Sequence, residues 1–114
     1  MSKYLNQKTT VNGLRFDSGK EAAMYHQLHL MEKAGQIQEL QTQVPFTILR
    51  KFVNANGEKV RAIKYIADFT FYDVKQKRIR VIDCKGYKTD VYKIKKKLFD
   101  SMAKDQGLYL EENI

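Results

Sequence analysis

The sequence has one cysteine, one proline and no long apolar run. A single cysteine, Cys84, excludes an internal disulfide and a cysteine-based zinc site. Because no apolar stretch approaches roughly 18 residues and no secretory signal is present, we expect a soluble, intracellular protein. Internal repeats, linkers and low-complexity segments are also missing, so residues 1–114 predict one domain with a modest core.

Positive charge is abundant and unevenly distributed. The formal net charge is +8, and residues 75–97 hold ten basic and two acidic side chains, which equals the whole excess. A basic segment of this kind favours a polyanionic partner, most simply nucleic acid, because lysines replace the counterions of the phosphate backbone. An ordinary solvated lysine face on a helix is the alternative interpretation.

Hydrophobic periodicity and turn residues predict an α/β domain with the element order α-β-β-β-β-α-β. A first helix is expected over 19–33, where Ser18 and Glu21 form a capping-box pattern. Before it, residues 1–12 are polar and basic and are expected to form a flexible arm. Strands are expected near 44–52, starting at an edge at Pro45, and near 60–72, 78–85 and 108–110. A second helix is expected over 91–104, with an apolar stripe of Val91, Ile94, Leu98 and Met102.

Two of the predicted strands carry acids in apolar surroundings. Asp68 lies inside the third strand, and Asp83 and Lys85 lie on one face of the fourth, because side chains alternate along a strand. In a tight antiparallel hairpin Asp68 would lie opposite Asp83. Two carboxylates this close repel each other unless a cation lies between them, and Mg²⁺ or Mn²⁺ is the natural ion for oxygen ligands.

Lys85 would then lie one step along the ladder from the ion. A lysine there can orient or help deprotonate a water molecule, or stabilise the charge that develops on a phosphate in the transition state. Phosphodiester hydrolysis is the reaction that uses all of these groups. The alternative is an ordinary hairpin in which Asp83 forms a salt bridge with Lys85.

Four segments along nearly the whole chain carry a family resemblance: Phe16-Asp17-Ser18-x-x-Glu21-Ala22, Tyr65-Ile66-Ala67-Asp68-Phe69, Asp83-x-Lys85-Gly86 and Lys93-x-Lys95-Lys96-Lys97-Leu98-Phe99. In this order they resemble the PD-(D/E)XK nuclease superfamily, which has the restriction-endonuclease-like fold. The resemblance is closest to a small phage-encoded family of that superfamily. It implies an α-β-β-β-α-β core with a mixed central sheet flanked by helices.

The resemblance also implies roles for particular residues. Asp68 and Asp83 would be metal ligands and Lys85 the catalytic lysine, although Ala67 stands where the superfamily has its name-giving proline. Glu21 matches a first-helix glutamate that joins the metal site in several branches, but it is equally a capping-box residue. Glu39 and Gln43 are weaker candidates for the metal site. Candidate nucleic-acid contacts are Lys88, Tyr92, Lys93, Lys96 and Lys97, with Tyr92 equally a possible core residue.

The sequence therefore predicts a metal-dependent phage or prophage nuclease that acts on DNA with Mg²⁺ or Mn²⁺ in the bacterial cytoplasm. A chain of this size has no room for a separate recognition domain, so we expect selectivity for DNA structure, as in junctions or flaps. The resemblance further implies a possible homodimer. Two other hypotheses stay open: a nucleic-acid-binding accessory protein without catalysis, and an interaction module whose basic helix binds an acidic protein.

Overall fold

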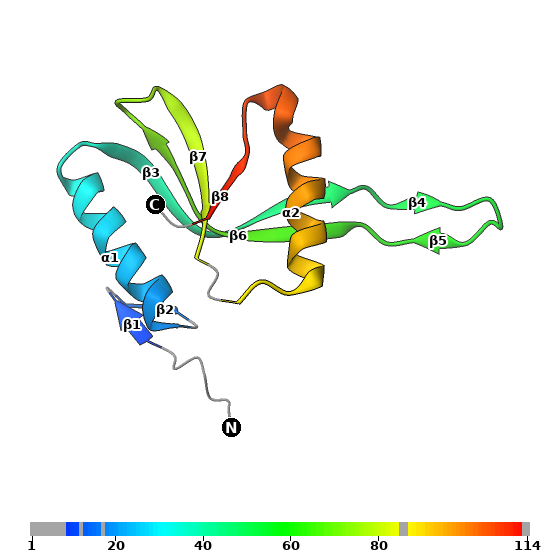
Figure 1. Ribbon diagram of the computed structural model, residues 1–114, viewed down its shortest axis with the longest axis horizontal. Helices are drawn as coiled ribbons and strands as arrows, with labels where there is room; N and C mark the ends of the chain where they lie inside the picture. The colour runs from blue at the N-terminus through cyan, green and yellow to red at the C-terminus, as the bar shows by residue number, and fades with distance from the viewer. Residues whose placement is uncertain (1–8, 12, 17, 85–86, 113–114) are drawn as a thin grey trace.

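The computed structural model describes residues 9–11, 13–16, 18–84 and 87–112 (Figure 1). Within these residues the chain forms two α-helices, one 3₁₀ helix and eight strands. In chain order they are β1 (Thr9–Val11), β2 (Leu14–Phe16), α1 (Gly19–Lys33), β3 (Ile37–Leu49), β4 (Phe52–Val53), β5 (Lys59–Val60), β6 (Ile63–Asp73), β7 (Arg78–Asp83), α2 (Asp90–Ala103), η1 (Lys104–Gln106) and β8 (Leu110–Glu112).

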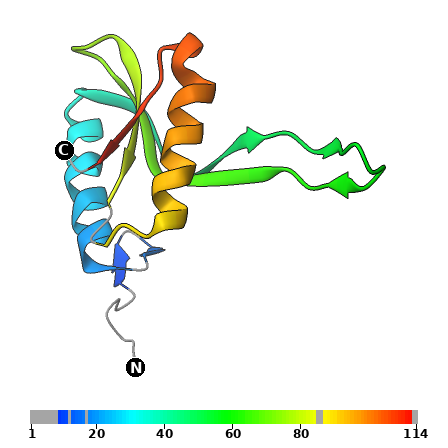
Figure 2. The ribbon, with the colours of Figure 1, turned by 45° about the vertical axis from the view of Figure 1, so that its right-hand side comes forward.

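The centre of the molecule is a mixed four-stranded sheet in the order β3-β6-β7-β8. β3, β6 and β7 are antiparallel neighbours, whereas β8 runs parallel to β7. α1 packs against one part of this sheet and α2 against another, and Figure 2 shows the sheet between them. The predicted α/β class with a mixed sheet and two helices is thus confirmed. Neither described helix is long and apolar enough to cross a membrane.

The first helix begins and ends where the sequence predicted. The Ser18 hydroxyl accepts a hydrogen bond from the Glu21 backbone N–H at 3.1 Å, which satisfies one of the donors left open in the first turn. Ala22, Tyr25 and Leu28 are buried on the sheet side of the helix. The aromatic rings of this cluster lie close together, with the centroids of Tyr25 and of Phe69 in β6 6.4 Å apart, so the helix is held to the sheet by apolar packing.

Two strand predictions needed correction. β3 begins at Ile37, so Pro45 lies inside the strand and pairs with Ile66 instead of marking the start. The position is tolerated because β3 is an edge strand, as Pro45 indicated. The predicted strand 60–72 is divided in two, β5 and β6, by the unpaired residues 61–62.

The predicted apolar stripe of the second helix was wrong at three of its four residues: Val91, Ile94 and Leu98 are exposed, and Met102 packs against the core. Val91 and Ile94 are 62% and 59% exposed, whereas Tyr92, Phe99 and Ala103 are buried. The aromatic side chains of α2 pack against the sheet instead, and the Phe99 ring meets the Phe46 ring edge-on at a centroid distance of 5.0 Å. α2 therefore keeps an apolar flank in solvent.

The predicted flexible arm is only partly within the described residues. Thr9–Val11 forms β1, which pairs with β2 in the register Thr9↔Phe16, so this part of 1–12 is an ordered strand. Residues 1–8 and 12 lie outside the described residues.

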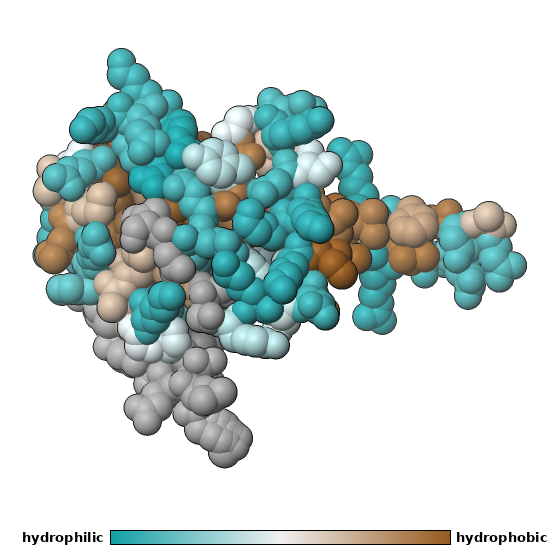
Figure 3. All heavy atoms as spheres, in the orientation of Figure 1, coloured by the Kyte–Doolittle hydropathy of each residue, from teal (hydrophilic) through white to brown (hydrophobic). Residues whose placement is uncertain are grey.

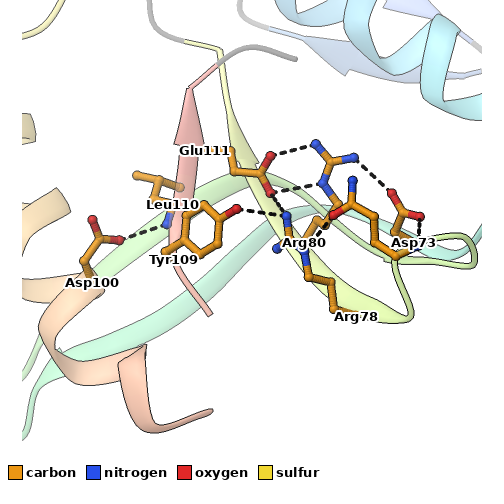
Figure 4. A network of polar contacts seen from close by, with 8 residues as sticks. Asp73, Arg78, Arg80, Asp100, Tyr109, Leu110 and Glu111 are labelled. Carbon is orange, nitrogen blue, oxygen red and sulfur yellow. Dashed lines mark hydrogen bonds and ion pairs between the residues drawn. The ribbon is translucent and has the colours of Figure 1, made fainter. Parts of the chain in front are cut away.

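A polar network joins β8 to the hairpin of β6 and β7 (Figure 4). Arg80 binds the carboxylates of Asp73 at 3.0 Å and of Glu111 at 2.6 Å, and only 12% of its side chain is exposed. Arg78 adds a second contact to Glu111 at 3.2 Å and lies over the Tyr109 ring. These two arginines and two acids are therefore paired with one another within the fold.

Candidate active site

The β6–β7 hairpin has the register that the sequence predicted. Phe69 pairs with Ile82 and Thr70 with Val81, so the ladder keeps the predicted register up to the residues adjacent to Asp68 and Asp83. The backbone N–H of Cys84 donates a hydrogen bond of 2.8 Å to Oδ2 of Asp68, which links the two strands at this level. Both acids are buried, with 7% and 0% of their surface exposed, and both lie at this end of the hairpin ladder.

The strand β6 changes its packing side at Asp68. Tyr65 and Ala67 belong to the core cluster beneath α2, whereas Phe69 belongs to the cluster beneath α1. Regular alternation would place these odd-numbered residues on one face. The neighbouring strand is irregular at the same level, because Gln43 lies between the pairs Thr42↔Phe69 and Val44↔Ala67 and has a φ of 54°.

A positive φ at a residue other than glycine costs on the order of 1–3 kcal/mol and is concentrated at functional sites. The side-chain contact of Gln43 gives a reason for this unfavourable backbone conformation. Its Nε2 donates a hydrogen bond of 2.8 Å to the Glu21 carboxylate, which is 7% exposed. Glu21 thus faces the sheet while its backbone N–H donates to the Ser18 cap, an arrangement that leaves its role at the metal site a prediction.

Asp83 is held by a residue that the sequence analysis missed. The Tyr65 hydroxyl donates a hydrogen bond to Oδ2 of Asp83. The Tyr65 ring in turn lies 6.3 Å from the ring of Tyr92, between centroids. A tyrosine in an apolar strand carries no sequence signal for this contact, because its hydroxyl reaches an acid eighteen positions away only through the sheet.

The three carboxylates act together on the thiol of Cys84. Burial first, and then the charges of Asp68, Asp83 and Glu21 in that order, together raise its pKa to about 12. Cys84 is 9% exposed and belongs to the core cluster beneath α1, as its sequence context predicted. The negative charges on α1, β6 and β7 thus all disfavour the thiolate form of Cys84.

Three residues of the expected motifs lie outside the described residues: Asp17, Lys85 and Gly86. β7 ends at Asp83, two positions before Lys85 in the chain. The role of Lys85 as the catalytic lysine therefore stays a prediction. Glu39, the other weak candidate, is exposed and has a φ of 55°.

The predicted nucleic-acid contacts fall into three groups. Lys93 and Lys97 are exposed on α2. Lys88 and Lys96 form salt bridges with Glu112 at 3.1 Å and with Asp100 at 3.0 Å. Tyr92 is 7% exposed, and its hydroxyl donates to Glu112 at 2.7 Å, so the structure assigns it to the core.

Comparison with known proteins gives a family but no function. A family model described as "Protein of unknown function (DUF1064)" matches residues 1–111. The chain belongs to this family. No curated protein and no solved structure matches the chain.

The donor chemistry at this site fits a hard divalent cation. Carboxylate oxygens are the ligands that Mg²⁺ and Mn²⁺ prefer, and Mg²⁺ is typically held by one or two carboxylates with water and substrate phosphates completing its shell. Among the described residues no group of three or more His, Cys, Asp or Glu is arranged to hold a metal ion. Asp68 and Asp83 alone meet the smaller requirement of Mg²⁺.

The raised pKa of Cys84 gives a direct test of this electrostatic environment. An ordinary thiol has a pKa near 8.5, so a pKa of about 12 leaves far less reactive thiolate at the same pH. We therefore expect iodoacetamide to alkylate Cys84 at least about 100-fold more slowly in the folded protein than in the unfolded chain. The rate should keep rising with pH up to about pH 11. Equal rates in native and denatured protein, or a plateau near pH 9, would contradict the burial of this thiol among carboxylates.

Proposed function

We propose that this protein is a metal-dependent nuclease that hydrolyses DNA phosphodiester bonds and belongs to the PD-(D/E)XK superfamily. The observation that carries the proposal is the burial of three carboxylates from α1, β6 and β7: Glu21, Asp68 and Asp83 are 7%, 7% and 0% exposed. Burying one carboxylate costs free energy unless it is paired, and burying three together is justified by a cation or a catalytic task.

The topology supports the same proposal. If the pairs β1–β2 and β4–β5 are set aside, the chain runs α1, β3, β6, β7, α2, β8, which is the α-β-β-β-α-β order of the restriction-endonuclease-like core. Asp68 lies inside β6, where the strand changes its packing side, and Asp83 is the last residue of β7. These are the second and third strands of that order.

Each residue of the site has a role in this proposal. Asp68 and Asp83 hold Mg²⁺ or Mn²⁺, which when bound supplies a water molecule of lowered pKa and neutralises charge on the phosphate. The Tyr65 hydroxyl and the Cys84 N–H each donate to one of these carboxylates and so fix its orientation. Gln43 positions Glu21 beside them. Lys85 is the proposed lysine that orients the attacking water.

The remaining parts of the proposal concern context. A single small domain fits a nuclease that selects branched or flapped DNA by shape. The proposal places the protein in the cytoplasm of a bacterial host, as a phage or prophage product, and includes a homodimer as an assembly that would present two sites to a junction.

A second function is favoured by a specific observation. Each of the three carboxylates already accepts a hydrogen bond within the fold, from Gln43, from the Cys84 N–H or from Tyr65. Such bonds also satisfy buried acids in a protein without catalysis. A nucleic-acid-binding accessory protein on the same fold is therefore the alternative.

A cleavage panel separates these two functions. Linear, flapped and four-way-junction DNA would be incubated with the protein and Mg²⁺ or Mn²⁺, with chelator as control. The nuclease proposal expects cleavage that disappears with chelator and prefers the branched substrates. Binding without cleavage under every metal condition would favour the accessory protein.

A further inference from the structure

A basic two-stranded ribbon projects from the sheet, and nothing in the sequence motifs accounts for it. We define the ribbon as residues 50–64, which contain β4, β5 and the turn between them. Apart from its base, where Lys95 of α2 donates to the Lys64 carbonyl at 3.3 Å, it lies clear of both helices in two views (Figures 1 and 2). The molecule measures 53 Å along its longest axis against 22 Å along its shortest. An isolated two-stranded hairpin is marginally stable in water, so a projecting ribbon indicates a use for its surface.

The charge of the ribbon is strongly one-sided. Its single acid, Glu58, accepts hydrogen bonds from Asn54 and Asn56 and is part of the turn. Its five cations are all exposed and form no salt bridge with an acid anywhere in the described part of the chain: Arg50, Lys51, Lys59, Arg61 and Lys64. The net charge of the sequence gives no sign of this cluster, because acids elsewhere in the chain balance its five cations.

Apolar side chains lie among these cations. Phe52 is 45% and Val53 63% exposed, and Figure 3 shows apolar residues beside hydrophilic ones along the projection. The pairing of Phe52 with Val60 and of Val53 with Lys59 places Phe52 and Val53 on opposite faces of the ribbon. Both faces therefore present apolar surface beside positive charge.

We propose that the ribbon is a DNA-binding arm that lies in a groove of the duplex, with its cations on the phosphates and Phe52 and Val53 against the groove walls. The major groove of B-DNA admits a two-stranded β-ribbon, whereas the major groove of A-form RNA is too narrow for side chains. A ribbon with five cations would repel the same ribbon of a second copy, which argues against self-association through this surface.

The arm extends the proposed function to substrate binding but does not require hydrolysis. Its attachment between β3 and β6, the strands that carry Gln43 and Asp68, makes it continuous with the candidate site. A duplex held along the ribbon would thus be anchored by the same two strands that position the carboxylates.

The test compares two double variants of equal charge change. In the first, Lys51 and Arg61 are replaced by glutamine; in the control, Lys33 and Lys104 are replaced, which are exposed and lie outside both the ribbon and the basic segment 75–97. Binding to duplex DNA, single-stranded DNA and duplex RNA is measured by fluorescence anisotropy in chelator at about 50–200 mM salt. We expect the ribbon variant to bind duplex DNA at least about tenfold more weakly, with a salt slope lower by about 2, and the control to change little.

Further measurements keep the two proposals separate. Phe52→Ala should also weaken duplex binding, while sedimentation of the protein alone stays unchanged. Equal binding by the two double variants, or a dimer that Phe52→Ala dissociates, would overturn the arm in favour of a neutral appendage or a protein interface. Binding that depends on the ribbon in a protein that never cleaves DNA would reject the nuclease and retain the arm.

Discussion

Replacing Asp83 by asparagine is expected to reduce Mg²⁺-dependent DNA cleavage by at least about 100-fold while leaving the protein folded. Asp83 is fully buried, and asparagine keeps its shape and an oxygen that can accept the Tyr65 hydrogen bond. What changes is the negative charge, and with it the ability to share a divalent cation with Asp68. Lys85→Ala should abolish cleavage as well, because this lysine is the proposed partner of the attacking water.

The matched control is Asp105→Asn, which removes an exposed acid from η1, far along the chain from the site. Its cleavage rate should equal that of the parent protein. Mn²⁺ binding followed by calorimetry gives a readout without turnover, and Asp83→Asn should weaken it by about tenfold or more. Undiminished cleavage by both Asp83→Asn and Lys85→Ala would contradict the nuclease proposal.

The position of the acidic pair could be predicted because it depends on local rules. A tight hairpin fixes its own register, and alternation then decides which side chains face each other. Asp68 and Asp83 needed nothing more than the turn at residues 74–77 to be brought together. Helix α1 was equally local, since the Ser18 cap and the spacing of its apolar residues define it.

The support around that pair could not be predicted, because it depends on strand pairing between distant segments. β3 shows little hydrophobic alternation before Val44, since most of its side chains face solvent at the sheet edge. Its irregular residue Gln43 therefore gave no sequence signal for the hydrogen bond to Glu21. The same limit applies to Tyr65, whose hydroxyl finds Asp83 only after β6 and β7 are assembled.

The choice of face on α2 failed for a different reason. A helix with apolar residues over a wide arc has more than one candidate face, and spacing alone does not rank them. Shape decides, because Phe99 and Tyr92 fill the space between β3, β6 and the helix, while Val91 and Ile94 stay in solvent. The projection of the ribbon was not predictable for a related reason. The turn at Asn56-Gly57 predicts a hairpin, but it does not predict whether that hairpin packs on the rest of the sheet or extends away from it.

Arg80→Met is expected to lower the free energy of unfolding at neutral pH by about 3 kcal/mol, measured by urea denaturation. Arg80 is mostly buried and binds both Asp73 and Glu111, so removing it leaves two carboxylates without their main cation (Figure 4). The Arg80 guanidinium lies over the Phe71 ring at 5.5 Å, and methionine, which has a similar length, places an apolar group beside the same ring. The loss is therefore electrostatic and not a packing defect.

The pH dependence of this loss follows from the two acids. The Gln76 N–H lowers the pKa of Asp73 against a burial penalty, and Arg80 lowers it further. Burial raises the pKa of Glu111, but the bonds and charge of Arg80 and Arg78 outweigh it and leave that pKa below its usual value. Groups with lowered pKa stabilise the fold above about pH 4 and lose this effect as the pH falls through the folded-state value. The difference between the parent protein and Arg80→Met should therefore shrink on acidification below about pH 4.

Two further variants decide whether the network is the cause. Lys88→Met removes a salt bridge to the neighbouring strand residue Glu112, but 45% of the Lys88 side chain is exposed, so we expect a loss below about 1 kcal/mol. Adding Glu111→Gln to Arg80→Met should recover part of the stability, because it removes one of the stranded charges. A loss of equal size in Lys88→Met and Arg80→Met, or one that does not vary with pH, would show that Arg80 contributes through packing. Recovery in the double variant would instead establish that β8 is joined to β7 by charge as much as by its short parallel ladder.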